Sequence, residues 1–224
     1  MSTDEQGAPI RRAFHGELEE LANDVQSLGE LAILSVKTGT KAFLSADMTA
    51  AEEVIEEDKA IDGLMVSIEM RSCELLARQQ PMAIDLRTIL TILRVIHELE
   101  RCGDYMVNIA KATRRLYPLQ LPGNLRHLIE KMRDQAIVQL QTGVAAFVEG
   151  DVAKAHALDD MDDVMDDLQK DLLREVFETS DPSDSMQLGV QVALVGRYFE
   201  RVADHAVNVG ERVQFMVNGF APTP

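Results

Sequence analysis

Pairs of acidic residues four positions apart stand out in this sequence, because the same pattern occurs twice. The first is found in the segment Glu100-Arg101-x-x-Asp104-x-x-x-Asn108. The same four residue types recur 100 positions later, in Glu200-Arg201-x-x-Asp204-x-x-x-Asn208. A repetition of this length, with arginine and asparagine in step with the acids, indicates a duplicated structural unit.

A second type of acidic pair is also present once in each half. Asp58-Lys-Ala-Ile-Asp62-Gly-Leu resembles Asp162-Asp-Val-Met-Asp166-Asp-Leu. Residues four apart lie one above the other on a helix, so each pair presents two carboxylates on one helix flank. Two neighbouring helices that bring such flanks together would gather four carboxylates at one surface groove in each half.

Four carboxylates in one groove repel one another unless a cation neutralises them. Carboxylate oxygen suits hard cations such as Mg²⁺, Mn²⁺, Ca²⁺ or ferric iron, whereas a zinc cage of cysteine and histidine does not fit these residues. The five histidines show no metal-ligand spacing, although His205 lies beside the second acidic motif. Asp159 and Asp163 crowd the pair at Asp162, and either is an alternative ligand there.

The elements that carry these acids are predicted to be helices. Apolar residues recur at helical spacing throughout, and no proline falls between Pro9 and Pro81 or between Pro122 and Pro182. No segment has the pattern of a strand. Six helices are predicted, over about 10–45, 49–79, 82–116, 123–149, 151–179 and 184–217.

The fold class is therefore all-α, with two tandem three-helix bundles that arise from an internal duplication. The segment from Tyr117 to Gly123 contains two prolines and separates the halves, so the predicted domains are residues 1–118 and 123–224.

Apolar stripes predict which face each helix buries, and the acidic pairs fall beside these stripes. In the helix of residues 151–179 the predicted stripe is Met161, Val164, Leu168 and Leu172. In the two helices with the longer motif the predicted stripes are Ile92, Val95, Ile96, Leu99, Cys102 and Met106, and Val192, Val195, Phe199, Val202, Ala206 and Val209.

The net charge, the number of cysteines and the length of the uncharged runs make several classes of function unfavourable. Among 224 residues the formal net charge is −16, which repels phosphate backbones and makes direct nucleic-acid binding an unfavourable role. Two cysteines are too few for a disulfide framework and favour a reduced, intracellular compartment. Residues 1–7 have no pattern of a signal peptide, and the longest uncharged run has 14 residues, whereas a membrane span needs about 20.

The motifs together resemble one known family. Gln80-Pro-Met-Ala-Ile-Asp-Leu-Arg87, followed by the two Glu-Arg-x-x-Asp-x-x-x-Asn segments, is similar to PhoU, the phosphate-uptake regulator of bacteria and archaea. The resemblance spans nearly the whole chain. One departure is that the second half has Asp181-Pro-Ser-Asp184 in place of a clear Asp85-Leu86-Arg87 counterpart.

The resemblance implies two multinuclear metal clusters, one in each half, with iron, zinc, magnesium or manganese as the ion. Carried over residue by residue, the implied ligands are Asp58, Asp62, Glu100 and Asp104 in the first cluster and Asp162, Asp166, Glu200 and Asp204 in the second.

The resemblance also implies a regulator without catalytic activity. Such proteins are thought to link the phosphate ABC transporter, through its ATPase subunit, to a sensor histidine kinase, and to restrain signalling when phosphate is plentiful. It further implies a homodimer in the cytoplasm, at the inner face of the membrane through transporter contacts and without insertion into it.

Two alternatives stay open. A carboxylate-bridged di-iron enzyme is one, but such sites usually include Glu-x-x-His, and none of the five histidines has glutamate three positions earlier. The other is a metal-free helical adaptor whose acidic flanks bind a basic partner.

Overall fold

The structure is a computed structural model that describes residues 7–118, 120–179 and 186–219. Within these ranges it contains α-helices and no strand, which confirms the all-α prediction. The helices are α1 (Gly7–Ser45), α2 (Met48–Gln79), α3 (Ala83–Leu116), α4 (Gly123–Glu149), α5 (Val152–Thr179) and α6 (Met186–Asn218). The predicted bounds therefore hold to within three residues.

Some predictions concern residues beyond the described ranges. The absence of a signal peptide rests mainly on residues 1–6, and the altered motif at Asp181–Asp184 lies within 180–185. The domain bounds 1–118 and 123–224 stay a prediction.

The turn between the first two helices of each half is built in the same way. Asp47 precedes α2, and its Oδ1 accepts hydrogen bonds from the backbone N–H groups of Thr49 and Ala50, at 2.9 and 3.0 Å. Asp151 precedes α5 and accepts from the N–H groups of residues 153 and 154 at 2.8 and 3.1 Å. These bonds satisfy N–H groups that a helix start leaves unpaired. The duplication seen in the sequence thus extends to the helix caps.

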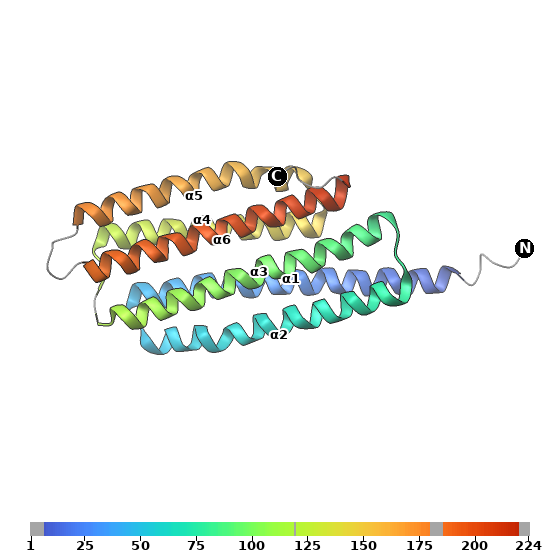
Figure 1. Ribbon diagram of the computed structural model, residues 1–224, viewed down its shortest axis with the longest axis horizontal. Helices are drawn as coiled ribbons and strands as arrows, with labels where there is room; N and C mark the ends of the chain where they lie inside the picture. Colours follow the sequence, from blue (N-terminus) through green and yellow to red (C-terminus); the bar gives the residue numbers. More distant parts are fainter. Residues whose placement is uncertain (1–6, 119, 180–185, 220–224) are drawn as a thin grey trace, which may run out of the picture.

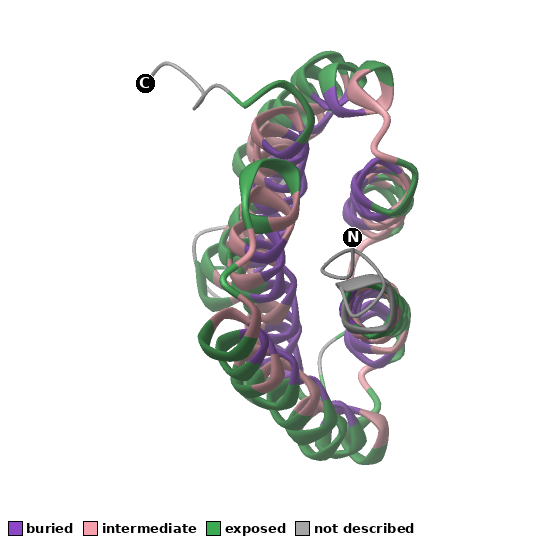
Figure 2. Cartoon of the chain, turned by 90° about the vertical axis from the view of Figure 1, so that its right-hand side faces the viewer, coloured by how far each residue is buried: buried purple, intermediate pink, exposed green. Residues whose placement is uncertain are grey.

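The helices form two layers (Figures 1 and 2). α5, α6, α3 and α2 follow one another in a curved layer, and α4 and α1 lie side by side against its inner face. Each half is a three-helix unit, and the halves meet where α3 contacts α6 and α1 contacts α4. Figure 2 shows the buried residues facing inward between the layers and the exposed residues facing outward.

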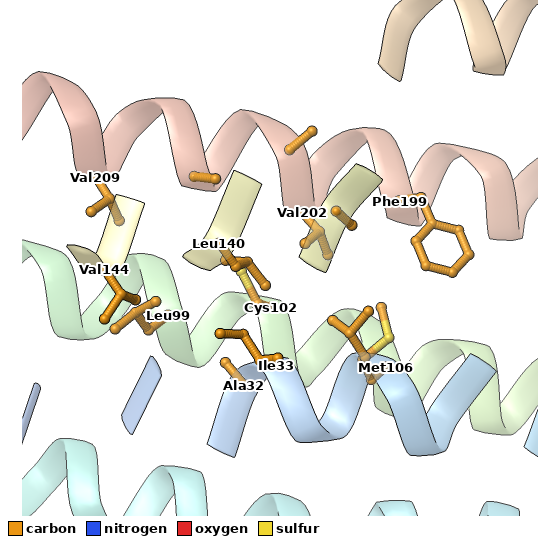
Figure 3. Packing of buried hydrophobic residues seen from close by; sticks show 14 of the residues in the cluster. Ala32, Ile33, Leu99, Cys102, Met106, Leu140, Val144, Phe199, Val202 and Val209 are labelled. Atoms are coloured by element: carbon orange, nitrogen blue, oxygen red, sulfur yellow. The ribbon is translucent and has the colours of Figure 1, made fainter. Parts of the chain in front are cut away.

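The core runs through both halves. Close to their junction, Leu99 and Cys102 of α3 pack with residues of α1, α4 and α6 such as Ala32, Leu140 and Val202 (Figure 3). All twelve residues of the predicted stripes of α3 and α6 are buried. Burial of this apolar surface is the main force that holds the six helices together.

The predicted stripe of α5 was wrong at one residue. Val164 is 48% exposed, and the fully buried residues are Leu158, Met165 and the correctly predicted Leu172. These three repeat every seven residues, so they define a line about 100° of rotation away from Val164. The helix is turned accordingly, which brings the line through Met165 toward α4 and α6.

Candidate metal centres

In the first half, four predicted site residues lie along the seam between α2 and α3. Asp58 of α2 and both Glu100 and Asp104 of α3 are partly buried, while Asp62 is exposed. Burial, followed by repulsion from Asp62, Asp104 and Glu100, raises the pKa of Asp58 to about 6. Burial and the charge of Asp104 also raise the pKa of Glu100. The four carboxyl groups are therefore close enough to act on one another.

Close approach of the two helices at this point depends on a glycine. A methyl group at Gly103 would lie 2.6 Å from Oδ1 of Asp58 and 2.9 Å from Cδ1 of Ile61. Gly103 separates Glu100 from Asp104 in the motif, so the absence of a side chain there makes room for Asp58 between them.

The second half repeats the arrangement between α5 and α6. Asp162, Glu200 and Asp204 are partly buried, and Asp166 is exposed. Burial, followed by repulsion from Asp204, Asp166 and Glu200, raises the pKa of Asp162 to about 6 as well. The two halves thus bring the same four positions together, and each half disfavours the ionised form of one aspartate.

The alternative ligands Asp159 and Asp163 are both exposed. Asp162, which lies between them in the sequence, is the aspartate of this stretch that is partly buried beside α6 and raised in pKa. The orientation of α5 therefore favours Asp162 as the member that faces the cluster.

Arginines occupy part of each cluster. Arg101 donates to Oδ2 of Asp104 at 2.9 Å and lies 3.7 Å from Glu100, while Arg201 donates to Oδ2 of Asp204 at 2.9 Å. Arg197 donates to Glu200. These pairs turn the α3 and α6 carboxylates toward the guanidinium groups and partly relieve the repulsion. Accordingly, no group of three or more His, Cys, Asp or Glu side chains in the described part of the chain is gathered as it would be around an ion.

The aspartates of α2 and α5 are not relieved in this way. Oδ1 of Asp58 and Oδ1 of Asp162 are buried and have no hydrogen-bond partner among the described residues. A buried carboxylate oxygen without a partner is costly, so each of these atoms needs a positive ligand or a donor from elsewhere. The donor set in each half consists of oxygen alone, which fits hard cations.

A hydrogen-bonded group between the two halves was missed by the sequence analysis. Oε2 of Glu98 on α3 lies 2.6 Å from Nδ1 of His205 on α6 and accepts from the amide of Asn208 at 3.0 Å. The other ring nitrogen of His205 lies 3.4 Å from the hydroxyl of Tyr105. Burial alone would raise the pKa of Glu98, but the bonds to His205 and Asn208 outweigh it, so the pKa is lowered. In the sequence His205 is notable because it follows Asp204, but its hydrogen-bond partner Glu98 is 107 residues away.

No helix in the described ranges is both long and apolar enough to cross a membrane.

Comparison with known proteins gives a consistent result. The PhoU domain family matches residues 25–113 and 129–213, one match in each half. A relative from Mycobacterium tuberculosis named "Phosphate-specific transport system accessory protein PhoU homolog 1" is 40% identical over 215 residues, which covers 96% of this chain and 97% of the relative. A homologue of the same description from Clostridium acetobutylicum is 33% identical and covers 93% and 96%.

Solved structures agree with these relatives. The regulatory protein PhoU of the phosphate transport system from Streptococcus pneumoniae superposes with a TM-score of 0.86 at 29% identity, covering 94% of this chain and all of that one. PhoU from Pseudomonas aeruginosa also gives a TM-score of 0.86, at 28% identity, with 92% of this chain covered.

Proposed function

The chain belongs to the PhoU family of phosphate-transport accessory and regulatory proteins, and on that premise we propose that it is a metal-binding regulator of phosphate uptake. The single observation that carries the metal-binding part is the pair of buried, unpartnered oxygens on Asp58 and Asp162. Each lies within a group of four carboxyl groups that repel one another.

The proposed ligands of the first cluster are Asp58, Asp62, Glu100 and Asp104, and those of the second are Asp162, Asp166, Glu200 and Asp204. An ion bound there would supply positive charge that cancels the repulsion and completes the coordination of the buried oxygens. Iron, magnesium and manganese match an all-oxygen donor set well, and zinc accepts it less readily. Before an ion binds, the arginines must release Asp104, Asp204 and Glu200.

The regulatory part of the proposal rests on the relatives. Their names describe an accessory protein of a phosphate-specific transport system. We propose that this chain acts in the cytoplasm, as a homodimer that contacts the ATPase subunit of a phosphate ABC transporter and a sensor histidine kinase. In phosphate-rich conditions it restrains both uptake and the starvation response, and it acts without catalysis, nucleic-acid binding or membrane insertion.

Elemental analysis of protein purified without chelator tests the metal sites. Glu100→Ala with Asp104→Ala should empty the first cluster and leave the second filled, with the helix content by far-UV circular dichroism unchanged. A matched control is Glu53→Ala with Asp160→Ala, which removes two exposed acids outside both clusters. Unchanged metal content in the first variant, or equal loss in the control, would refute the ligand assignment.

Two experiments in cells test the regulatory part. Deletion of the gene should switch on a phosphate-starvation reporter in phosphate-rich medium, and a reporter that stays silent contradicts negative regulation. Affinity purification from native membranes should recover the transporter ATPase subunit and the kinase, and recovery of neither contradicts the proposed coupling.

The metal-free adaptor keeps some support, because arginines already pair with Asp104, Asp204 and Glu200. It predicts that protein purified without chelator contains no metal, and that Mn²⁺ does not change the temperature of unfolding. The metal-binding proposal predicts the opposite in both measurements.

A further inference from the structure

The two halves differ behind the buried aspartate of each cluster. The caps at Asp47 and Asp151 align α1 with α4 and α2 with α5 at a spacing of 104 residues. At that spacing Leu31 and Ser35 of α1 correspond to Gln135 and Gln139 of α4. Two amide side chains in the second half therefore replace a leucine and a serine in the first.

The amide of Gln135 fixes where α4 lies against α5. Its Nε2 donates to the backbone carbonyl of Met161 at 2.7 Å, one residue before Asp162. Gln139 follows one helical turn later on the same face of α4. This register places Gln139 in the layer between α4 and the inner side of the second cluster.

Gln139 is fully buried, with 0% of its surface exposed. Neither its Nε2 nor its Oε1 has a hydrogen-bond partner among the described residues, and the same holds for Oδ1 of Asp162. Even so, Gln139 lies close enough to Asp162 to lower the pKa of its carboxyl group, which partly offsets the effects of burial and charge. A donor and an acceptor that are both buried, adjacent and unsatisfied gain most by pairing with each other.

The first half has a hollow at the corresponding place. A pocket of about 180 Å³ is lined by Leu31, Leu34, Ser35, Glu57, Ala60 and Ile61. Ser35 is too short to fill it, and the charge that lowers the pKa of Asp58 comes instead from Lys111 of α3. No amide supports the first aspartate from α1.

We propose that Gln139 is a positioning residue of the second cluster. When a cation is bound, Nε2 of Gln139 donates to the carboxyl group of Asp162 and so fixes the orientation of that carboxyl group toward the cation. This inference rests on the proposed metal sites and adds that a residue of α4 supports the second site, whereas no residue of α1 plays this part at the first.

A hydrogen bond to a ligating carboxylate fixes its orientation, and loss of such a partner typically weakens metal binding about 10- to 100-fold. Gln139→Met removes the donor and keeps the length of the side chain. Because the amide is unsatisfied before metal binds, this change should leave the metal-free unfolding temperature unchanged or slightly higher.

The test isolates each site by Mn²⁺ titration calorimetry of the full chain. Asp58→Asn with Asp62→Asn leaves the second site, and adding Gln139→Met should weaken Mn²⁺ binding at least about tenfold. Asp162→Asn with Asp166→Asn leaves the first site, and there Gln139→Met should change the affinity by less than about twofold. Ser35→Ala in this second background is the matched control and should also have little effect.

The outcomes distinguish an error in the proposed metal sites from an error in the role of Gln139. If wild-type protein and both backgrounds fail to bind Mn²⁺, the proposed metal sites are wrong and this inference falls with them. If the second site binds Mn²⁺ equally well with and without Gln139, the metal sites stand and the role of Gln139 is refuted. A weaker affinity accompanied by a matching fall in metal-free unfolding temperature would also refute it, because it would show a packing role.

Discussion

The first and second halves arrange their acidic residues alike but bring the supporting helices together at different points. α2 and α3 approach closely at Gly103, within the acidic cluster, where Asp58 occupies the space of a side chain. The residue in that place in α6 is Ala203. In the second half, α5 and α6 instead approach closely at Gly196 and Gly210, which lie one to two helical turns to either side of the acidic cluster.

The halves also relieve the charge of the buried aspartate by different means. Lys111 lowers the pKa of Asp58 through its positive charge, whereas the neutral amide of Gln139 lowers that of Asp162. The residue of α6 that corresponds to Lys111 is Glu211, which brings no positive charge. The positions of the eight acids are therefore common to both halves, while the packing behind them is not.

The largest expected effect is that of Gly210→Ala in the second half. The new methyl group would lie 2.8 Å from Cδ1 of Leu158 and 2.9 Å from the backbone carbonyl oxygen of Ala155. A backbone atom cannot move aside cheaply, so we expect a loss of about 2–3 kcal/mol of unfolding free energy. Thermal unfolding of metal-free protein measures it. Ala110→Gly, the reciprocal change at a buried position of the first half, should cost less, about 1.5–2 kcal/mol, and equal losses would contradict the difference in packing.

A smaller loss of stability but a sharper effect on metal is expected for Gly103→Ala. The methyl group would displace Oδ1 of Asp58, which is the end of a flexible side chain, so the cost should be about 1 kcal/mol. Mn²⁺ binding at the first site should be lost, and binding at the second should be unchanged. Ala203→Gly should leave Mn²⁺ binding intact at both sites, and a loss of metal there would show that the halves depend on this position equally.

The pH dependence of stability should reveal both buried aspartates. Each has a folded-state pKa of about 6 against an ordinary value of 3.8, so the folded state binds more protons than the unfolded state between these values. Stability of the metal-free protein therefore falls as pH rises from about 4 to 6, and the penalty is complete above pH 6. Unfolding should occur a few degrees lower at pH 7 than at pH 5. Asp58→Asn and Asp162→Asn should each remove a similar part of this pH-dependent loss of stability. A wild-type unfolding temperature that does not change with pH would contradict the raised pKa values.

The smallest expected effect concerns the arginines. Arg101→Gln and Arg201→Gln remove ion pairs that compete with a cation for Asp104 and Asp204, so each should strengthen Mn²⁺ binding in its own half. Exposed pairs of this kind contribute at most about 1 kcal/mol, which corresponds to a gain of about fivefold or less. Arg114→Gln, whose partner Glu52 is outside the clusters, is the control and should have no effect. Weaker binding after either substitution would show that the arginine supports the site.

Much of the architecture was predictable from the sequence because its signals are local. Helical periodicity and the spacing of prolines gave six helices, and the i,i+4 acids fell on flanks beside buried stripes. The duplication places one acidic pair of each type in each half, so neighbouring helices were expected to gather four carboxylates in one groove. This reasoning predicted that Asp58 lies near Glu100 and Asp104, which the electrostatic interactions of Asp58 agree with.

What the sequence did not predict depends on contacts between distant segments. Val164 and Met165 of α5 are both apolar, and only packing against α4 and α6 decides which is buried. Gln139 reads as one of three glutamines within an uncharged run, and nothing local indicates that it faces Asp162. Glu98 and His205 are equally isolated in sequence and meet only because α3 and α6 are adjacent.

The contact between Glu98 and His205 has a counterpart across the junction of the halves. With α3 and α6 related by a spacing of 100 residues, the equivalent pair is Tyr198 and Tyr105, whose rings are stacked with centroids 5.9 Å apart. Two identical single-repeat chains that joined as a dimer would have to place the same pair of residues at both points. Covalent fusion removes that symmetry requirement, and it leaves one contact free to be a hydrogen bond while its twin is aromatic.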